Sequence, residues 1–371
     1  MGSHVRSRST TSENPSDLLD FVALSLMPSW CRLPIADGLR QREPPADLFA
    51  RLAVRHWPDA PAAIVAIRAK AQAAIARGAA AGLTPIAWSD ARYPAALAAI
   101  VDPPPLLWTR GDPASLDTTL VAIVGSRAAS TYARSVATTL ASDLAARGVV
   151  VVSGLARGVD SAAHRGALDA DGPTIAVLGS GVDVVYPPEH APLVDEIARR
   201  GLVVSELVPG TPPMAHFFPL RNRIISGVSR AVVVIEAHEK SGSLITARCA
   251  LEQGRDVLAV PGNVLTGRNR GAHALLKDGA KIVESADDIL EELGMRVARS
   301  GFRVQGSAGT SDPLLDCFVP GEPADLDELA ERSGLVPSRL LPRLMELELA
   351  GAVARVGGGR FVRIGLGSKP C

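Results

Sequence analysis

The middle of the chain alternates short, wholly apolar runs with segments of helical periodicity. The apolar runs, most of them rich in valine and isoleucine, are Thr119–Gly125, Val149–Ser153, Thr174–Leu178, Leu202–Ser205, Ala231–Glu236, Val257–Val260 and Lys281–Val283. Helical patterns lie between them, for example at Tyr132–Arg147 and Leu244–Gln253. This alternation predicts an α/β fold whose parallel sheet is covered on both faces, and such sheets bind ligands at the carboxyl ends of their strands.

Two other regions flank this middle part. Residues 17–85 are rich in alanine and leucine and are interrupted by prolines and glycines, which predicts a small N-terminal helical domain of short helices. A proline-rich stretch, Trp88–Asp112, is expected to be a connector into the sheet domain at residues 86–295. Residues 1–16 are polar and begin like an expression-tag remnant, so we expect them to stay outside the fold.

The C-terminal part has its own pattern. Residues 296–315 contain glycine, serine and arginine without periodicity, which predicts a linker. Residues 316–366 read as a helix, a turn at Gly334, a second helix and a hairpin that turns at Gly357–Gly359. Helix, turn, helix and hairpin in this order predict a winged-helix domain.

Composition and charge narrow the class of protein. The 371 residues suit two or three domains, and 47% hydrophobic with 21% charged residues predicts a soluble globular protein. Lysine plus arginine equals aspartate plus glutamate at 39 each, so any basic surface must be local. No apolar run reaches membrane-spanning length.

The cysteines do not suggest a metal or a disulfide framework. There are four, far apart in the sequence: Cys31, Cys249, Cys317 and Cys371. No Cys-x-x-Cys or Cys/His cluster indicates zinc. This spacing favours no metal and a reduced cytoplasmic compartment. We also expect no cofactor.

Glycine- and serine-rich loops follow several of the predicted strands. Gly125, Ser126 and Arg127 open a helix after the first run, and Ser241, Gly242 and Ser243 do so after the fifth. A helix start offers backbone N–H groups and a positive dipole end to phosphate, and Arg127 adds a forked donor. Any one of these loops is explained by a tight turn. Their repetition along one sheet edge favours a phosphate-binding surface over isolated turns.

The stretch Phe217–Arg223 combines aromatic and cationic residues ahead of an apolar strand. Arg221 and Arg223 are expected to reach the same sheet edge, with Asn222 binding DNA or capping the helix. Several phosphate contacts beside Phe217 and Phe218, whose flat rings suit unstacked bases, favour a single strand. Core packing is the alternative for one of the two rings.

Catalytic residues are not indicated. Glu206, Glu236 and Glu239 fall near strand ends, but no activated nucleophile or metal spacing accompanies them. We expect Glu236 to pair with an arginine of the site and His164 to be structural.

Several long motifs, in one order, resemble the bacterial DNA-processing protein A (DprA/Smf) family. They are "GSR" at 125–127, "SGLARGVDSAAHRGAL" at 153–168, "VLGSGVDVVYPPEH" at 177–190, "FPLRNRIISGVS" at 218–229 and "SGSLITARCALEQGRDVLAVPG" at 241–262.

The resemblance implies an extended Rossmann-like core, an N-terminal helical domain of the SAM or helix-hairpin-helix kind, and a winged helix. It also implies a homodimer that binds single-stranded DNA, protects incoming DNA and loads the recombinase RecA onto it during natural transformation, with no enzymatic activity. The DNA contacts carried over by the family motifs are Arg127, Phe218, Arg221 and Arg223. We expect further DNA contacts from Asn222 and, because they lie nearby, from Gly125, Ser126, Ser241, Gly242 and Ser243. The family often has a basic residue before its Phe-Pro motif, where this chain offers only His216.

Two other classes remain open. A Rossmann-like nucleotide phosphoribohydrolase would also place glycine-rich loops at this edge, although this chain has "SGSLITARCA" where the PGGxGTxxE pattern of those enzymes is expected. A winged-helix transcription regulator would read DNA with its second helix, which here offers only Arg339 and Arg343 as basic residues.

Overall fold

The structure is a computed structural model that describes residues 15–295, 312–319, 322–349 and 352–363. Most of the predicted tag region and most of the predicted linker lie outside these residues. The chain forms a nine-stranded sheet of order β1-β2-β6-β5-β4-β3-β7-β8-β9 and a separate two-stranded sheet, β10-β11. The strands of the large sheet are β1 Thr84–Ala87, β2 Leu106–Gly111, β3 Leu120–Val124, β4 Val150–Ser153, β5 Thr174–Val177, β6 Leu202–Ser205, β7 Ala231–Val234, β8 Asp256–Ala259 and β9 Lys281–Ile282.

The α/β prediction is confirmed, with one addition. Strands β3, β4, β7, β8 and β9 pair in parallel, as their apolar runs predicted. Strands β1 and β2 were not expected. They pair antiparallel with each other, and β2 pairs antiparallel with β6, so the sheet is mixed. The segment predicted as a connector therefore contributes a strand.

Two compact units divide the chain. One comprises residues 1–118 and 176–228, and the other residues 119–175 and 229–371. Each unit takes residues from two separate stretches of sequence.

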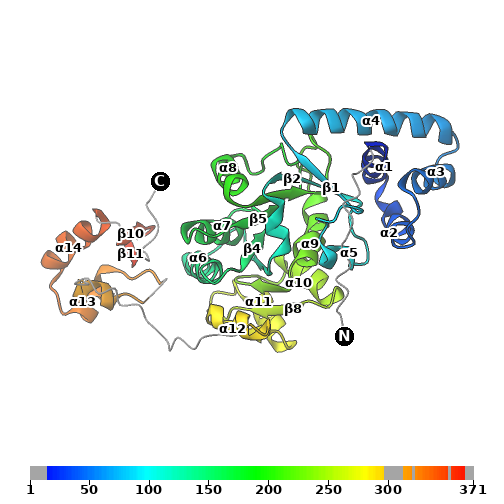
Figure 1. Ribbon diagram of the computed structural model, residues 1–371. Coiled ribbons are helices and arrows are strands. Elements are labelled where there is room, and N and C mark those ends of the chain that lie inside the picture. Colours follow the sequence, from blue (N-terminus) through cyan, green and yellow to red (C-terminus); the bar gives the residue numbers. More distant parts are fainter. Residues whose placement is uncertain (1–14, 296–311, 320–321, 350–351, 364–371) are drawn as a thin grey trace, which may run out of the picture. The chain divides into compact units, whose positions relative to one another are not determined.

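The first unit contains the N-terminal helices and the antiparallel strands. Its helices are α1 Pro15–Ser25, α2 Arg32–Arg40, α3 Pro45–His56, α4 Ala60–Ala80, α5 Ala95–Ala98, α8 Ala191–Arg200 and α9 Phe217–Val228. Helix α4 is alanine-rich and capped by the Asp59 carboxylate, which accepts from the Ala62 N–H at 3.1 Å. It packs against α1 and α3 (Figure 1), and an ion pair of 2.8 Å joins Arg68 to Asp20 of α1.

A glycine lets α4 approach strand β2 closely. A Cβ atom at Gly78 would lie 2.5 Å from the ring of Trp108. Trp108 belongs to β2 and is fully buried. The small residue thus allows the helix and the strand to share one core.

The second unit is the parallel half of the fold. Its helices are α6 Thr131–Ala145, α7 Val159–Asp169, α10 Ser243–Glu252, α11 Arg270–Lys277 and α12 Ala286–Glu292. The Ser130 hydroxyl caps α6, accepting from the Ala133 N–H at 3.1 Å. Valine and isoleucine of the strands and alanine and leucine of the helices share one buried core, which includes Val121, Ile123, Leu140, Leu144, Val233 and Leu258. Each such aliphatic side chain contributes roughly 1.5–3 kcal/mol when fully buried.

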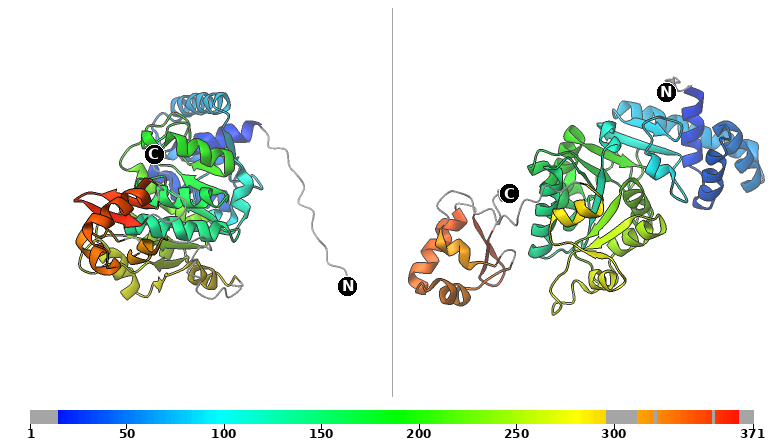
Figure 2. Two further views of the ribbon diagram at one scale, coloured as in Figure 1. Left: turned by 90° about the vertical axis from the view of Figure 1, so that its left-hand side faces the viewer. Right: turned by 60° about the horizontal axis from the view of Figure 1, so that its bottom comes forward.

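The winged-helix pattern is confirmed. It comprises α13 Leu326–Ser333, α14 Pro337–Leu349, β10 Val353–Val356 and β11 Arg360–Arg363 (Figures 1 and 2, orange to red). Gly334 ends α13 in the left-handed conformation with φ of 68°. Leu329, Leu340, Leu344, Val353 and Phe361 form a buried core of their own. This body therefore has the local core that an independently folding domain needs.

Candidate nucleic-acid interface

The loop after β3 is held by a buried carboxylate. Ser126 donates its backbone N–H to the carbonyl of Glu236 at 2.7 Å, and Ser130 donates its backbone N–H to Glu236 Oε1 at 3.1 Å. Glu236 follows β7 and is 4% exposed. The prediction that it pairs with an arginine is wrong, because the described contacts of its carboxylate include no ion pair. A strand end and a loop from another part of the sequence are thereby tied together.

Close packing fixes the first glycine-rich loop against the second. A Cβ atom at Gly158, whose φ is 83°, would lie 2.3 Å from the carbonyl oxygen of Ser126. A Cβ atom at Gly125 would lie 2.6 Å from the Val159 side chain. The backbone N–H of Val159 also donates to the Ser126 carbonyl at 3.2 Å. Arg127 therefore projects as an exposed side chain from a backbone that has little freedom.

The third loop feeds α10. Ser241 and Ser243 share a hydrogen bond between their hydroxyls at 2.7 Å, and the Ser241 N–H donates to the His238 carbonyl at 2.9 Å. Gly242 is exposed, and a Cβ atom there would meet nothing within 4 Å. The start of a ten-residue helix carries a partial positive charge that favours an anion beside these small residues.

The loops at the carboxyl ends of β4, β3, β7 and β8 are locally basic, although the whole chain is neutral. Their exposed cations are Arg127, Arg157, Lys240 and Arg268. Of the exposed residues in these fully described loops, only Glu239 is a carboxylate, and it lies 3.7 Å from Arg270. Arg268 donates to the Ala128 carbonyl at 3.0 Å, beside Arg127. Four loops with fixed cations suit a polyanion that runs across several strands.

In the first unit, Arg223 is buried in α9 and paired with two carboxylates. Its guanidinium lies 2.9 Å from Asp102 and 2.6 Å from Glu206, and its side chain is 8% exposed. Burial lowers the pKa of Arg223, but the two carboxylates raise it, and the net shift is upward. An arginine–carboxylate pair therefore exists, with Glu206 rather than with Glu236.

Arg221 and Asn222 are buried as well. The guanidinium of Arg221 donates to the carbonyl of Val177, at the end of β5, and to Asn222 Oδ1 at 3.1 Å. All three polar residues of this motif thus hold neighbouring backbone and side chains within their unit. Their predicted contact with DNA stays a prediction.

The two phenylalanines point to different neighbours, and both are half-buried. The Phe218 ring lies 5.4 Å from the ring of Tyr186, measured between centroids. Gly179 leaves room for it, since a Cβ atom there would be 2.9 Å from the Phe218 ring. Phe217 instead lies 4.2 Å from the ring of His216 and lines a cavity.

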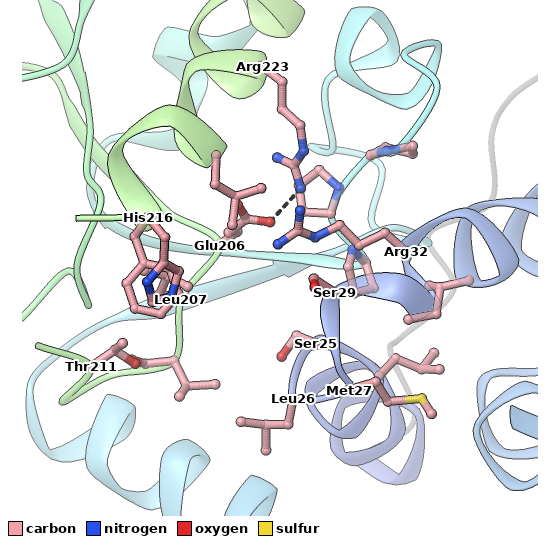
Figure 3. A pocket seen from close by; sticks show the side chains of 18 residues that line it. Ser25, Leu26, Met27, Ser29, Arg32, Glu206, Leu207, Thr211, His216 and Arg223 are labelled. Atoms are coloured by element: carbon pink, nitrogen blue, oxygen red, sulfur yellow. Dashed lines mark hydrogen bonds and ion pairs between the residues drawn. The ribbon is translucent and has the colours of Figure 1, made fainter. Parts of the chain in front are cut away.

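Sequence reasoning missed that cavity. It has a volume of about 420 Å³ and is lined by α1, the start of α2, the prolines before β2, and the segment from Glu206 to α9 (Figure 3). Arg32 reaches into it, and burial lowers the pKa of that guanidinium while Glu206 acts in the opposite direction. No sequence signal links Arg32 to Glu206, because they are separated by most of the first half of the chain.

Other polar groups have structural partners. His164 is fully buried and its Nδ1 lies 2.8 Å from the Thr174 hydroxyl, which donates to the Val151 carbonyl. This agrees with the structural role expected for it. In the winged helix, Arg343 is paired with Asp312 at 2.6 Å and with Glu346.

Within the described part of the chain, no cluster of three or more histidine, cysteine or acidic residues has a geometry that could hold a metal ion. No single described helix is both long and apolar enough to cross a membrane. One bent pair, Asp17–Ser25 with Ser29–Arg40, meets the length and composition requirement when taken together.

Comparisons with known proteins agree with this geometry. The family described as DNA recombination-mediator protein A matches residues 84–294, and the DprA winged helix domain matches residues 305–359. Protein Smf of Escherichia coli is 42% identical over 281 residues, which are 73% of this chain and 75% of that protein. The putative DNA processing protein DprA of Mycobacterium tuberculosis is 43% identical over 274 residues, 71% of this chain and 70% of its own length.

A solved structure has the same fold. DNA processing protein A from Streptococcus pneumoniae superposes with a TM-score of 0.64 at 36% identity, covering 73% of this chain and 95% of that one. DNA processing protein A from Helicobacter pylori, whose structure is described for its single-stranded DNA binding mode, superposes with a TM-score of 0.52 at 32% identity. The match covers 57% of this chain and 95% of that one. The chain therefore belongs to the DNA recombination-mediator protein A family, the DprA/Smf family of bacterial DNA-processing proteins.

Proposed function

We propose that this protein binds single-stranded DNA, protects it and loads RecA onto it during natural transformation. The observation that carries the proposal is the row of glycine- and serine-rich loops with exposed arginines and lysine at the carboxyl ends of β4, β3, β7 and β8. Family membership supports it, and so does the single-stranded DNA binding described for the Helicobacter pylori relative.

In this proposal the strand contacts two kinds of residue directly. The phosphates lie beside Gly125, Ser126 and Arg127 and beside Ser241, Gly242 and Ser243. These residues offer hydroxyls, a cation and the positive N-terminal end of α10. Phe218 offers a ring face to a base, a contact worth roughly 1–3 kcal/mol that tolerates any sequence.

The buried residues of α9 contribute in another way. Arg221, Asn222 and Arg223 fix the loops around Val177 and Glu206 through the contacts described above. A direct phosphate contact would require their side chains to leave these partners. We therefore propose that they position the surface on which the strand lies.

The protein then acts by binding DNA rather than by catalysis. It does so in the cytoplasm and as a homodimer. A titration of a fluorescent oligo-dT against a duplex of equal length tests the choice of DNA. Tight binding to the duplex with none to oligo-dT would overturn the proposal and favour a regulator. Free adenine released from AMP would favour the phosphoribohydrolase alternative.

RecA loading and dimerisation need separate measurements. We expect the protein to accelerate RecA-dependent ATP hydrolysis on single strands already coated with a single-strand-binding protein. We expect analytical ultracentrifugation to give twice the monomer mass of 38.6 kDa. A protein that binds oligo-dT but leaves the RecA rate unchanged would keep the binding proposal and remove the loading one.

A further inference from the structure

The cavity beside the N-terminal helices combines one donor, one acceptor and apolar walls. Arg32, Glu206 and Arg223 supply its charged groups, and Figure 3 shows the Arg32 guanidinium directed toward the other two. Its volume of about 420 Å³ falls within the usual range for small-molecule sites. All of its lining residues belong to the first unit.

Two charged side chains of the cavity wall, Glu206 and Arg32, have hydrogen-bonding atoms without a partner among the described residues. Arg223 occupies one oxygen of Glu206 at 2.6 Å. The other, Glu206 Oε1, is buried and accepts no hydrogen bond from the described residues. The described residues likewise include no hydrogen-bond or ion-pair partner for Arg32, although Glu206 is close enough to act on it electrostatically. A buried acceptor without a donor is destabilising, so a ligand that donates a hydrogen bond here is favoured.

The charges argue against a free anion as the ligand. Arg32 and Arg223 are balanced by Glu206 and by Asp102, which pairs with Arg223 at 2.9 Å. The site is therefore neutral overall, with a donor and an acceptor side by side. A neutral heteroaromatic ring with one acceptor and one donor on adjacent positions matches this pattern.

The remaining walls suit a flat ring. Pro103, Pro104 and Pro105 line one part of the cavity, and Met27, Leu207 and Phe217 line others. Phe217 lies one residue before Phe218 at the start of α9, so a strand stacked on Phe218 would lie next to the segment that lines the cavity.

We propose that this cavity takes one nucleobase of the bound single strand and selects a base with an exocyclic amino group. The amino group donates a hydrogen bond to Glu206, and a ring nitrogen of the base accepts one from Arg32. The inference rests on the proposed function and adds sequence preference to it. Cytosine presents its N4 amino donor beside the ring acceptor N3, and adenine presents its N6 amino donor beside the ring acceptor N1 or N7. Thymine has no amino group, and its single ring N–H lies between two carbonyls, one of which would face the carboxylate.

The test compares oligo-dC with oligo-dT by fluorescence anisotropy at fixed salt concentration. Both strands are pyrimidine homopolymers, so backbone contacts are matched. We expect wild type to bind oligo-dC about tenfold tighter. Arg32→Ala should remove this preference while affinity for oligo-dT stays within about twofold. Arg55→Ala, which removes an exposed cation of α3 in the same unit, should retain it.

A second variant tests whether the space in the cavity is needed, without removing a charge. Ser29 is exposed and lines the cavity, so Ser29→Phe should fold and crowd the site. It should abolish the preference for oligo-dC without changing the salt dependence of binding. Circular dichroism checks that both variants keep their secondary structure.

Several results would overturn the inference. Equal wild-type affinity for oligo-dC and oligo-dT would do so while leaving the proposed function intact. An Arg32→Ala variant that weakens both strands equally and reduces the salt slope would make Arg32 a phosphate contact instead. Free CMP that binds tightly, with no oligo-dC preference, would assign the cavity to a free nucleotide. Failure of both strands to bind would remove the proposed function itself.

Discussion

At the residue scale, the arginines of this protein divide into two kinds with opposite expected behaviour. Arg127 is exposed on a loop whose backbone is fixed by Gly125 and Gly158. Arg223 is buried between two carboxylates. The first should govern DNA affinity and the second stability.

Arg127→Ala should weaken binding to oligo-dT with little dependence on base sequence, because a phosphate contact positions the strand without reading it. Losing one such contact should reduce the slope of log affinity against log salt concentration by about 0.7. Arg147→Ala is the matched control, since Arg147 follows the far end of α6 and pairs with Asp287 at 2.8 Å. Equal affinity and slope in wild type and Arg127→Ala would place the strand elsewhere.

Arg223→Ala should lower the free energy of unfolding by about 3–5 kcal/mol, because it leaves Glu206 and Asp102 near the interior without their cation. Urea unfolding measures this. Arg55→Ala, at an exposed position, should stay within about 0.5 kcal/mol of wild type. A loss below about 1 kcal/mol at Arg223 would mean that the two carboxylates are solvated without their partner.

Phe218→Ala should reduce affinity for oligo-dT by roughly 1–3 kcal/mol and leave the salt slope nearly unchanged, because it removes a stacking face and no charge. Its ring contacts Tyr186 rather than the cavity, so the loss should be similar for oligo-dC and oligo-dT. An oligonucleotide with abasic sites provides the check. If wild type binds it as tightly as oligo-dT, the Phe218 ring is only structural.

At the element scale, the winged helix has a hydrophobic core of its own. Its buried leucines, Val353 and Phe361 form a core that shares no residue with the core of the parallel strands. Its second helix exposes Leu341 and Met345. The guanidinium of Arg343 forms ion pairs with Asp312 and Glu346. These features fit a body that packs on a partner better than one that reads bases.

A chain that ends at Met295 should therefore fold and bind oligo-dT with an affinity within about threefold of the full chain. Circular dichroism and anisotropy measure the two properties. If the shortened chain were native-like but lost most of its affinity, the winged helix would be a main DNA contact.

At the scale of the whole molecule, the net charge of zero conceals a local basic surface. Each phosphate contact made to a single strand contributes about 0.7 to the salt slope. Contacts from Arg127, Arg157, Lys240 and Arg268 would therefore give a slope of about −2 to −3 per protomer. Affinity for oligo-dT measured at several salt concentrations tests this, and a slope near zero would contradict a backbone-binding surface.

The sequence by itself determined the parallel strands, the loops after them and the winged helix. These features depend on local patterns: an apolar run such as Ala231–Val234, a small-residue loop such as Ser241–Ser243, and a left-handed glycine at 334 between two helices. Each is encoded within one element and its neighbours, so periodicity and turn chemistry suffice to predict it.

Only the tertiary structure decided what distant segments do to one another. The segment Leu106–Gly111 follows three prolines and was predicted to be part of a connector. It forms strand β2 because β6, about a hundred residues later in the sequence, pairs with it. Arg223 was expected to reach the sheet edge, and it is buried because Asp102 and Glu206 neutralise it there. Arg32 and Glu206 meet at one cavity for the same reason. Burial and pairing depend on which segments come together in space, and no local pattern carries that information.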